Sequence, residues 1–497
     1  WANASGDFTD PRKEPFGALP DHSLRWNGLH VHGENVVLDY SVHGARVLEL
    51  PSSDSASGQV VFIREFAIGP ASPPLKAALA DFPKDAAKSS PKGIVVADGA
   101  NAARIALLNA PSNVALEIET ANDTSRAVLK IPPAKKEIRF TVALWSGSQT
   151  NSEAVDAKLA ELKKSKRALP EIAAALSKGG PAHWPETVET RGSLNTSATP
   201  DGAYATDSIT APTDNPWKRR VRFAGLDFFS DGTRAALCTH DGDIWIVSGI
   251  DDSLEHLKWR RFASGQYETL GLVIVDDVIY TSGRDQITRY HDYNGDGEAD
   301  FYENFNNDTV VTENYHEFCL DLQTDSAGNF YYAKGAPWPP DVRSPHQGTM
   351  LKVSPDGKKL EVYATGFRAP NGMAIGPADE ITVSDNEGHW MPTSKINLVK
   401  PGLFYGMVPT AHRPPPSTFE QPIAWIPKSM DNSSGGQVWV NSDKWGPFQN
   451  QMLFMSYGKA SMFLVMRDEA DGQMQAALTQ FPIRRSEEHT SELQSQF

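Results

Sequence analysis

Cysteine is nearly absent from this chain of 497 residues, which contains only Cys238 and Cys319 and no Cys-x-x-Cys-His motif. The two cysteines lie in separate strand-like segments, so we expect buried thiols rather than a disulfide. The missing motif excludes covalent haem attachment within the chain. Long apolar runs are also missing, since no segment approaches the roughly 20 residues that a membrane-spanning helix requires. The sequence therefore predicts neither a disulfide-stapled fold nor a membrane span.

Positive charge is in deficit, because 47 Lys and Arg stand against 62 Asp and Glu and give a formal net charge of −15. A surface with this balance repels phosphate groups. We therefore expect neither nucleic acid nor an anionic membrane among the partners of this protein.

Helical periodicity is scarce and confined to residues 149–190. Three apolar residues fall on one stripe there, Thr150 and Glu153 have the spacing of a capping box, and Gly179-Gly180-Pro181 breaks the pattern. We interpret 149–190 as a helical and Gly/Pro-rich linker between two larger parts of the chain.

The sequence does contain one pattern that is repeated between Ala224 and Gly406. Each copy has an apolar strand, a tight turn of Asp, Gly or Asn, a second strand rich in Tyr, Val and Ile, a charged loop and a third strand. The apolar residues that open the copies recur at intervals of 46, 50 and 51 residues, and we expect them to be buried: Leu226, Leu272, Leu322 and Met373, with Val438 as a fifth opening.

Repeats of this length that are built from short strands are typical of β-propeller blades. We therefore predict an all-β protein in which residues 191–484 form an incomplete β-propeller of about five blades, with six or more in the full protein. The innermost strands of a propeller surround a central channel. The loops that lead into these strands converge at one mouth of that channel, where function is expected.

Residues 1–148 carry a second set of short strands with regular turn spacing, which predicts a separate β-sandwich-like accessory domain. Within it, His30 and His32 alternate in phase and share a strand face. They are either two metal ligands or two polar residues on an exposed strand, and the second interpretation is the simpler one.

The two ends of the chain have their own interpretation. Residues 485–497 resemble the translation of a sequencing-library adapter, and we treat them as an artefact. The chain begins at Trp1 with neither Met nor a signal peptide, so we expect a fragment of a longer protein in which at least one further blade closes the ring.

The segment Asp292–Glu303 matches the twelve-residue calcium loop. Side-chain oxygens recur at positions 1, 3, 5, 9 and 12, a Gly occupies the sharp turn, and a backbone carbonyl is available at position 7. The predicted ligands are Asp292, Asn294, Asp296, the carbonyl of Glu298, Asp300 and Glu303. Because the loop leaves the third strand of its blade, we expect a structural Ca²⁺ at the propeller rim; an acidic turn without metal is the alternative.

Polar residues precede the opening residue of each blade by four to six positions: Glu268, His316, Arg368 and Asn432. Loops between second and third strands add a further set at the same mouth: Arg284, Lys334, Asp385, His389 and Lys459. A neutral His beside cations and amides can abstract a proton while the cations hold an anionic cofactor or substrate. Four tryptophans are candidates for stacking on sugar rings: Trp338, Trp390, Trp425 and Trp439.

Several motifs at this mouth resemble the soluble aldose/glucose and sorbosone dehydrogenase propellers: His316 before a first strand, Gly366-Phe-Arg368-Ala-Pro-Asn371-Gly, Ser384-Asp-Asn-Glu387 and Ile396 to Gly406. Such enzymes use pyrroloquinoline quinone. The resemblance implies that His316 takes the hydroxyl proton of a sugar or polyol and that Arg368 steadies the quinone. We expect His316, Arg368 and Glu268 to be catalytic. The expected cofactor contacts are Arg368, Asn371, Arg284, Lys334, Asn432 and Lys459.

A longer stretch, from Trp26 to Arg484, resembles large uncharacterised exported bacterial proteins that are described as haem-binding because relatives carry a fused c-type cytochrome. The phrases that carry this resemblance are Asp214-Asn-Pro-Trp217, Asn304 to Asp308 and Asp431 to Gly436. It implies a periplasmic or cell-surface location. It also implies a cytochrome as electron acceptor, with haem c only outside this chain.

The chain departs from the dehydrogenase pattern beside two residues, since Glu317 follows His316 and Ala369 follows Arg368. Two other functions therefore stay open. One is a lactonase-like hydrolase, in which Asn371 and Asp385 hold a divalent metal ion. The other is a non-catalytic propeller that binds glycan or presents a haem domain to a protein partner.

Overall fold

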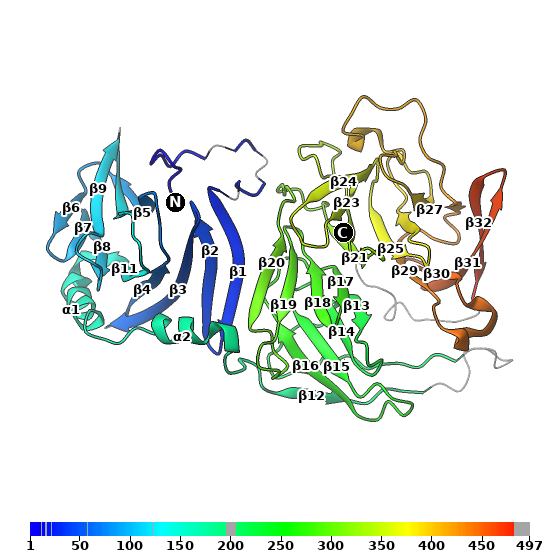
Figure 1. Cartoon of the computed structure of the whole chain (residues 1–497), viewed down its shortest axis with the longest axis horizontal. Coiled ribbons are helices and arrows are strands. Elements are labelled where there is room, and N and C mark those ends of the chain that lie inside the picture. Colours follow the sequence, from blue (N-terminus) through cyan, green and yellow to red (C-terminus); the bar gives the residue numbers. More distant parts are fainter. Residues whose placement is uncertain are drawn as a thin grey trace. The chain divides into compact units, whose positions relative to one another are not determined.

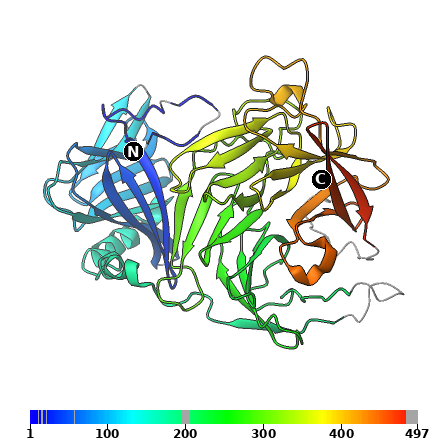
Figure 2. The same cartoon turned by 45° about the vertical axis from the view of Figure 1, so that its right-hand side comes forward.

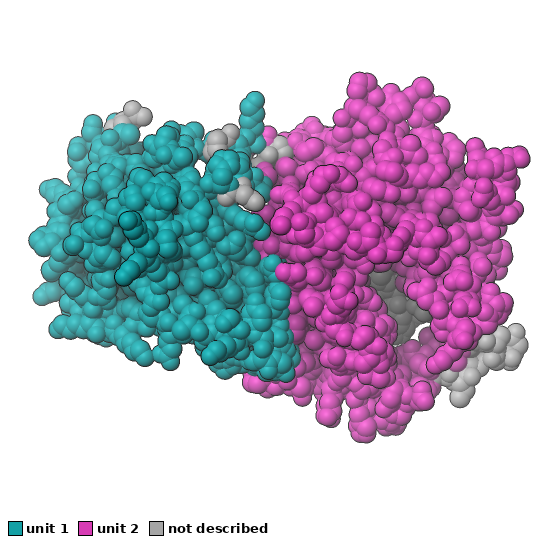
Figure 3. Space-filling model, in the orientation of Figure 1, with its two compact units in different colours: residues 1–13, 18–183, 291–303 teal, residues 14–17, 184–290, 304–497 magenta. Residues whose placement is uncertain are grey.

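The computed structural model describes residues 1–481 except for 11, 15, 16, 21, 57, 122 and 195–204. The segment 485–497, interpreted above as an artefact, lies outside the described residues. The chain divides into two compact units (Figure 3): unit 1 comprises residues 1–13, 18–183 and 291–303, and unit 2 comprises residues 14–17, 184–290 and 304–497. Both are built mainly of antiparallel strands, which confirms the predicted all-β class.

Unit 1 contains two sheets, as the predicted sandwich requires (Figure 1). The larger sheet has the order β1 (Leu24–His32), β2 (Asn35–Val42), β3 (Ala45–Ala56), β4 (Gln59–Ile68), β11 (Ile138–Ser148), β8 (Asn101–Leu108), β7 (Gly93–Asp98) and β6 (Ala87–Ser90). The smaller sheet has the order β5 (Leu75–Pro83), β10 (Thr124–Ile131) and β9 (Ala115–Ala121). Apolar side chains of both sheets form one core, in which Phe66 and Phe140 stack at 5.1 Å and pack with Leu75 and Leu129.

The helices α1 (Ser152–Leu162) and α2 (Leu169–Ala175) cover the other face of the larger sheet, preceded and followed by the short 3-10 turns Gln149–Asn151 and Leu176–Lys178. Leu159 of α1 packs in one cluster with Trp145, and Ile172 of α2 packs in another with Leu50. The predicted linker therefore belongs to unit 1 as far as residue 183. The predicted capping box is wrong: the N-cap is Asn151, without a side-chain cap, and the Thr150 hydroxyl lies 2.9 Å from that of Ser148.

Five sets of four consecutive antiparallel strands form the blades of the predicted propeller (Figures 1 and 2). Four of the blades lie in unit 2, and blade two lies there except for residues 291–303 at its end, which belong to unit 1. Blade one is β13 (Phe223–Phe228), β14 (Ala235–Thr239), β15 (Ile244–Ser248) and β16 (Leu257–Ala263), with β12 (Thr187–Thr190) beside β16; blade two is β17 (Gly271–Val275), β18 (Val278–Ser282), β19 (Ile287–His291) and β20 (Phe301–Asn306). Blade three is β21 (Cys319–Thr324), β22 (Phe330–Lys334), β23 (Thr349–Val353) and β24 (Leu360–Thr365). Blade four is β25 (Pro370–Ile375), β26 (Ile381–Asp385), β27 (Ser394–Val399) and β28 (Ala424–Ile426); blade five is β29 (Ser434–Trp439), β30 (Met452–Ser456), β31 (Ser461–Ala470) and β32 (Gln473–Gln480), and 3-10 turns lie at Val408–Thr410 and Asp443–Phe448.

The innermost strands β13, β17, β21, β25 and β29 are neighbours in that order. Apolar clusters fill the spaces between the successive blades from two to five. Tyr280 of blade two packs with Phe330 of blade three, Met373 of blade four with Met350 of blade three, and Ile396 of blade four with Phe454 of blade five. This face-to-face packing of consecutive sheets is propeller architecture.

The burial of the opening residues corrects the sequence prediction. Leu272, Leu322 and Met373 are buried, but Leu226 is 57% and Val438 is 53% exposed. The neighbours of Leu226 face blade two, since Gly225 lies against the backbone of Leu272 and Asp227 accepts the N–H of Ile274, so Leu226 points away from that blade. In blade five the buried residue is the preceding one, Gln437, which pairs with Phe454. Successive side chains of a strand point to opposite faces, so Val438 projects from the exposed face.

Two equivalent polar contacts join turns of neighbouring blades. The backbone N–H and hydroxyl of Ser230 both donate to the carboxylate of Asp277, with an N–H distance of 2.8 Å. Ser326 donates to Asp379 in the same way, with an N–H distance of 2.9 Å. The first contact joins blade one to blade two and the second joins blade three to blade four, so the repeat of the sequence extends to the contacts between blades.

Cys238 and Cys319 are buried and unpaired, as predicted. In the described parts of the chain, no helix has the length and apolar character needed to cross a membrane.

Candidate functional site

A repeated hydrogen bond brings two loops of every blade together. In each blade, the backbone N–H just after the second strand donates to a carbonyl just before the innermost strand: His240 to Arg222, Arg284 to Tyr267, Gly335 to Phe318, Asn386 to Ala369 and Gly458 to Ser433, at 2.9 to 3.2 Å. We call this end of the blades the mouth. The two predicted sets of loops therefore lie at the same end of each blade.

His316 lies at the mouth and has a fixed ring orientation. Its Nδ1 lies 2.6 Å from the carbonyl oxygen of Ala336. A carbonyl can only accept, so Nδ1 carries the proton and the lone pair of the neutral ring is on Nε2. Burial and the positive charge of Arg368 lower the pKa of His316, although the bond to Ala336 opposes this effect. The ring is therefore neutral near pH 7, as a general base requires.

Arg368 lies in the half-buried segment before β25. Its guanidinium covers Gly388, where a Cβ would come within 2.4 Å of Cζ, and Gly388 has a φ of +148°. The residue at 388 must therefore be glycine for the guanidinium to keep this place. Within the described residues, no carboxylate forms an ion pair with Arg368, so its charge is available to an anion close to His316.

Arg284 and Glu268 were predicted to face a ligand, but the structure pairs them with each other. Arg284 Nε lies 2.6 Å from Glu268 Oε2. The two terminal nitrogens of Arg284 donate to the carbonyls of Asn314 and Tyr315 at 2.9 and 2.7 Å. The guanidinium is only 3% exposed, so Arg284 organises the loop that carries His316.

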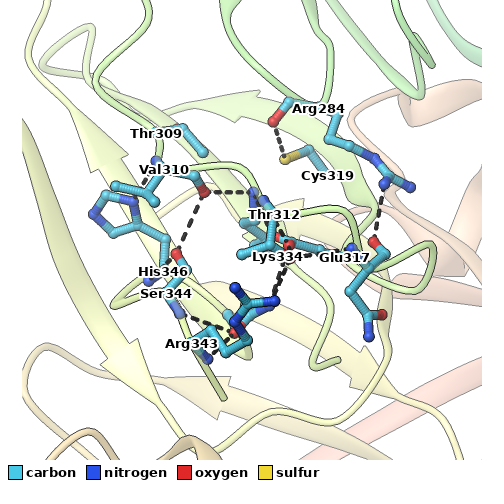
Figure 4. A network of polar contacts seen from close by, with 12 residues as sticks. Arg284, Thr309, Val310, Thr312, Glu317, Cys319, Lys334, Arg343, Ser344 and His346 are labelled. Atoms are coloured by element: carbon cyan, nitrogen blue, oxygen red, sulfur yellow. Dashed lines mark hydrogen bonds and ion pairs between the residues drawn. The ribbon is translucent and has the colours of Figure 1, made fainter. Parts of the chain in front are cut away.

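Lys334 forms a fully buried ion pair with Glu317 at 3.0 Å, and its Nζ also donates to the carbonyl of Val310 (Figure 4). Glu317 accepts further hydrogen bonds from Thr312 and from Gln347. A cation held in this way is committed to the interior of blade three. We therefore do not count Lys334 among the residues available to a cofactor.

Asn371 and Asp385, the metal ligands of the hydrolase hypothesis, are also engaged. The Asn371 amide donates to the carbonyl of Ser434 at 2.6 Å and so joins blade four to blade five. Asp385 is fully buried and accepts the backbone N–H of Arg368 and of Ala369. Burial raises the pKa of Asp385, which opposes the ionised form that a metal ligand needs. The other two predicted cofactor contacts, Asn432 and Lys459, are exposed at the mouth of blade five.

Aromatic side chains lie at the mouth, and the ring centroids of Tyr315 and Phe318 are 5.9 and 6.4 Å from that of His316. Tyr267, Tyr315 and Trp390 are each about half exposed. The ring centroids of Trp338 and His389 lie 4.4 Å apart, with the planes tilted by 49°. The side chain of Asn314 links the backbone of Trp338 to that of His316. Of the four tryptophans named from the sequence, Trp338 and Trp390 lie at the mouth, whereas Trp425 lies on the outer strand β28 and Trp439 is buried in blade five.

The mouth also contains His240, which is not among the site residues predicted from the sequence. His240 follows β14, and its ring centroid lies 6.4 Å from that of Phe318, the same distance as that of His316. Its position between second and third strands is the one that drew attention to Arg284 in blade two. The position of His240 in the repeat is therefore the sequence signal that indicates it.

The predicted calcium loop belongs to unit 1 rather than to a free rim of blade two. Asp292 accepts the backbone N–H of Gly295 and of Gly297, and Asp300 accepts those of Tyr293 and of Gly180. Asn294 and Asp296 accept the N–H two residues further on, Glu298 accepts that of His183, and Glu303 pairs with His291 at 2.6 Å. Across the described residues, no group of three or more His, Cys, Asp or Glu side chains converges on a metal position.

The two histidines of unit 1 do not form a metal pair with a shared acidic ligand. His30 is buried, lies 3.3 Å from Asp39 and stacks on Phe301 at 4.1 Å. His32 lies against Gly180. The structure thus agrees better with two polar strand residues than with two metal ligands. It differs from that interpretation in one respect, because His30 is buried rather than exposed.

Comparison with known proteins gives one family match, a domain of unknown function (DUF6797) over residues 1–49. No curated protein matches the chain. Among solved structures, it is similar to an apo-form soluble aldose sugar dehydrogenase from Escherichia coli (15% identity, 52% of this chain and 86% of that one, TM-score 0.41). It is also similar to the PQQ-bound aldose sugar dehydrogenase from Streptomyces coelicolor (15% identity, 60% and 86%, TM-score 0.39) and to a gluconolactonase from Xanthomonas campestris (14% identity, 52% and 75%, TM-score 0.30).

Proposed function

We propose that unit 2 is an oxidoreductase that acts on a hydroxyl group of a sugar or other polyol, with His316 as general base. The observation that supports this proposal most is the 2.6 Å contact between His316 Nδ1 and the Ala336 carbonyl, because it leaves Nε2 as a proton acceptor. The adjacent positive charge of Arg368 would stabilise the alkoxide that forms when the hydroxyl loses its proton.

Oxidation also needs an electron acceptor, and a bound pyrroloquinoline quinone would supply it by accepting two electrons. Three of the six predicted contacts are available at the mouth: Arg368, Asn432 and Lys459. They come from blades four and five and offer two cations and an amide, which suits an anionic quinone. Export and transfer of electrons to a c-type cytochrome are further parts of this proposal, and they rest on the resemblance described for residues 26–484.

A second candidate is a glycan-binding propeller without turnover. It is favoured by the half-exposed rings of Tyr267, Tyr315 and Trp390, which are the kind of surface on which sugar rings stack. The two proposals share a ligand class and differ in chemistry. The hydrolase hypothesis receives less support, because both of its predicted metal ligands are held by backbone groups.

The test compares His316→Ala and Arg368→Ala in the full chain, with sugar-dependent reduction of a dye as the activity and titration of pyrroloquinoline quinone as the binding assay. Loss of the base should reduce kcat by about 10²- to 10⁴-fold with little change in quinone binding. Loss of the guanidinium should weaken quinone binding by about 1.5 to 3 kcal/mol. His256→Ala, an exposed histidine at the opposite end of blade one, is the control.

The outcomes separate the two candidates. Saturable quinone binding with base-dependent turnover supports the oxidoreductase. Sugar binding without turnover at any quinone concentration would leave the glycan-binding function in its place.

We also propose that the loop Asp292–Glu303 binds Ca²⁺. Burial raises the pKa of Asp300, and the nearby charges of Asp292 and Asp296 add to this effect. Carboxylates that repel one another in this way gain from a bound cation. The hydrogen bonds from the loop backbone to Asp292, Asn294 and Asp296 already set the turn that the calcium loop needs.

A further inference from the structure

His240 is held at the mouth by one residue through two contacts. The backbone N–H of His240 donates to the carbonyl of Arg222 at 3.1 Å, and the Arg222 guanidinium lies 2.6 Å from His240 Nδ1. A guanidinium can only donate, so Nδ1 is an acceptor. The neutral ring of His240 therefore carries its proton on Nε2.

This arrangement is the reverse of that at His316. There a carbonyl accepts a hydrogen bond from Nδ1–H, and the lone pair is on Nε2. The two histidines thus present opposite groups at the same position of the ring. His240 offers a hydrogen-bond donor and His316 offers an acceptor.

Both rings lie around the side chain of Phe318. Their centroids are each 6.4 Å from the Phe318 ring, with interplanar angles of 55° for His240 and 56° for His316. In the described part of the chain, neither Nε2 forms a hydrogen bond. Burial and the charge of Arg222 lower the pKa of His240 while Glu268 opposes this, so the ring is neutral near pH 7 and its tautomer is defined.

We propose that Nε2–H of His240 donates a hydrogen bond to a second oxygen of the molecule whose hydroxyl is deprotonated at His316. The inference rests on the proposed oxidoreductase function and deepens it. A substrate that uses both histidines needs two oxygen atoms set apart along its skeleton. The site should therefore prefer polyols and sugars to simple alcohols, with His240 as a residue that determines this specificity.

Two variants separate the donor from the bulk of the ring. His240→Gln keeps an N–H close to the position of Nε2, whereas His240→Leu removes it. With xylitol or D-glucose as substrate, we expect KM to rise about 3- to 10-fold in His240→Leu, in line with one lost hydrogen bond, and to stay near the wild-type value in His240→Gln. With propan-1-ol, all three proteins should have the same KM. His256→Leu is the control for loss of a histidine in blade one.

A measurement that needs no turnover tests the same inference. In ¹⁵N NMR of the full chain, His240 should show the Nε2–H tautomer and His316 the Nδ1–H tautomer, and xylitol should shift the signals of both rings. An Nδ1–H tautomer at His240 overturns the inference whatever the activity of the protein. If xylitol is oxidised and shifts His316 alone, His240 has no part in binding and the proposed function stands. If no polyol shifts either ring or is oxidised, the proposed function fails and the inference fails with it.

Discussion

At the scale of single residues, the ion pairs of a cation at the mouth determine whether its charge is available to a ligand. Arg284, Lys334 and Arg368 look alike in the sequence, where each is a cation in a loop or strand end near the mouth. Arg284 and Lys334 are both buried and are paired with the carboxylates of Glu268 and Glu317, and of the three cations only Arg368 keeps its charge for a ligand. Spacing predicted which residues come to the mouth. It could not predict the ion pairs of Arg284 and Lys334. Their partner Glu268 was itself predicted to be catalytic, and Glu317 was interpreted as a departure from the dehydrogenase motif.

His346 allows a prediction of pH dependence at this scale. Its Nδ1 accepts the backbone N–H of Val310 at 2.9 Å, and burial together with the charges of Lys334 and His412 lowers its pKa to about 4. The unfolded chain, with a pKa near 6.5, takes up the proton first as the pH falls. The contribution to stability is thus complete above about pH 6.5 and is lost as the pH falls to about 4.

The substitution His346→Asn keeps an acceptor for Val310 and removes the titration. We expect the variant to lose less stability than the wild type between pH 7 and pH 4.5, with a difference of at most about 3 kcal/mol. Urea unfolding at the two pH values measures it. Parallel losses in both proteins would contradict the assignment.

At the scale of strands and turns, the inner strands of every blade were predictable, whereas the outer strands were not. The inner strands are apolar runs between Gly, Asp and Asn turns, as in β17 and β18. Outer strands such as β16 carry Lys258, Arg260 and Arg261 among apolar residues, and β28 has only three residues, so neither shows a clear period. The predicted start of α1 at Thr150 is wrong, because the Thr150 hydroxyl contacts that of Ser148 instead of capping the helix.

The turn at Asp276 and Asp277 provides a matched test of the contact between blades one and two. Both residues have positive φ, of 50° and 60°, but only Asp277 binds Ser230. Asp276→Gly and Asp277→Gly therefore make the same change in backbone freedom. We expect Asp277→Gly to be less stable than Asp276→Gly by about 0.5 to 1.5 kcal/mol, the contribution of such hydrogen bonds. Equal unfolding free energies of the two variants would show that the contact contributes nothing.

At the scale of the whole molecule, corresponding residues of the repeat have different surroundings. Leu322 packs between blades two and three, whereas Leu226 is 57% exposed on blade one. We expect Leu322→Ala to cost about 2 to 5 kcal/mol of unfolding free energy and Leu226→Ala less than about 1 kcal/mol. Chemical denaturation of both variants measures the difference. A large loss in Leu226→Ala would mean that another surface covers blade one in solution.

The proposed calcium ion gives a second prediction at this scale, because its loop belongs to unit 1. The N–H of Val31 in β1 donates to the carbonyl of Asp300 at 2.8 Å. Removal of calcium by a chelator should lower the melting temperature and increase hydrogen exchange at Val31. Asp296→Ala should already have the lower melting temperature and no longer respond to chelator, whereas Asp356→Ala, in an exposed turn of blade three, should respond like the wild type. If the chelator does not change hydrogen exchange at Val31, the calcium proposal is wrong and the loop is an acidic turn without metal.

The passage of residues 291–303 through unit 1 has a consequence for the order of folding. Phe301–Glu303 pair with β1, and this segment follows the whole of blade one in the chain. Synthesis of residues 1–183 is therefore not sufficient to complete unit 1, because residues 291–303 are still missing. The nascent chain must keep the edge of β1 unpaired while blade one emerges, and the last strand of unit 1 arrives only with the end of blade two. Neither unit can thus be finished before synthesis of the other has begun.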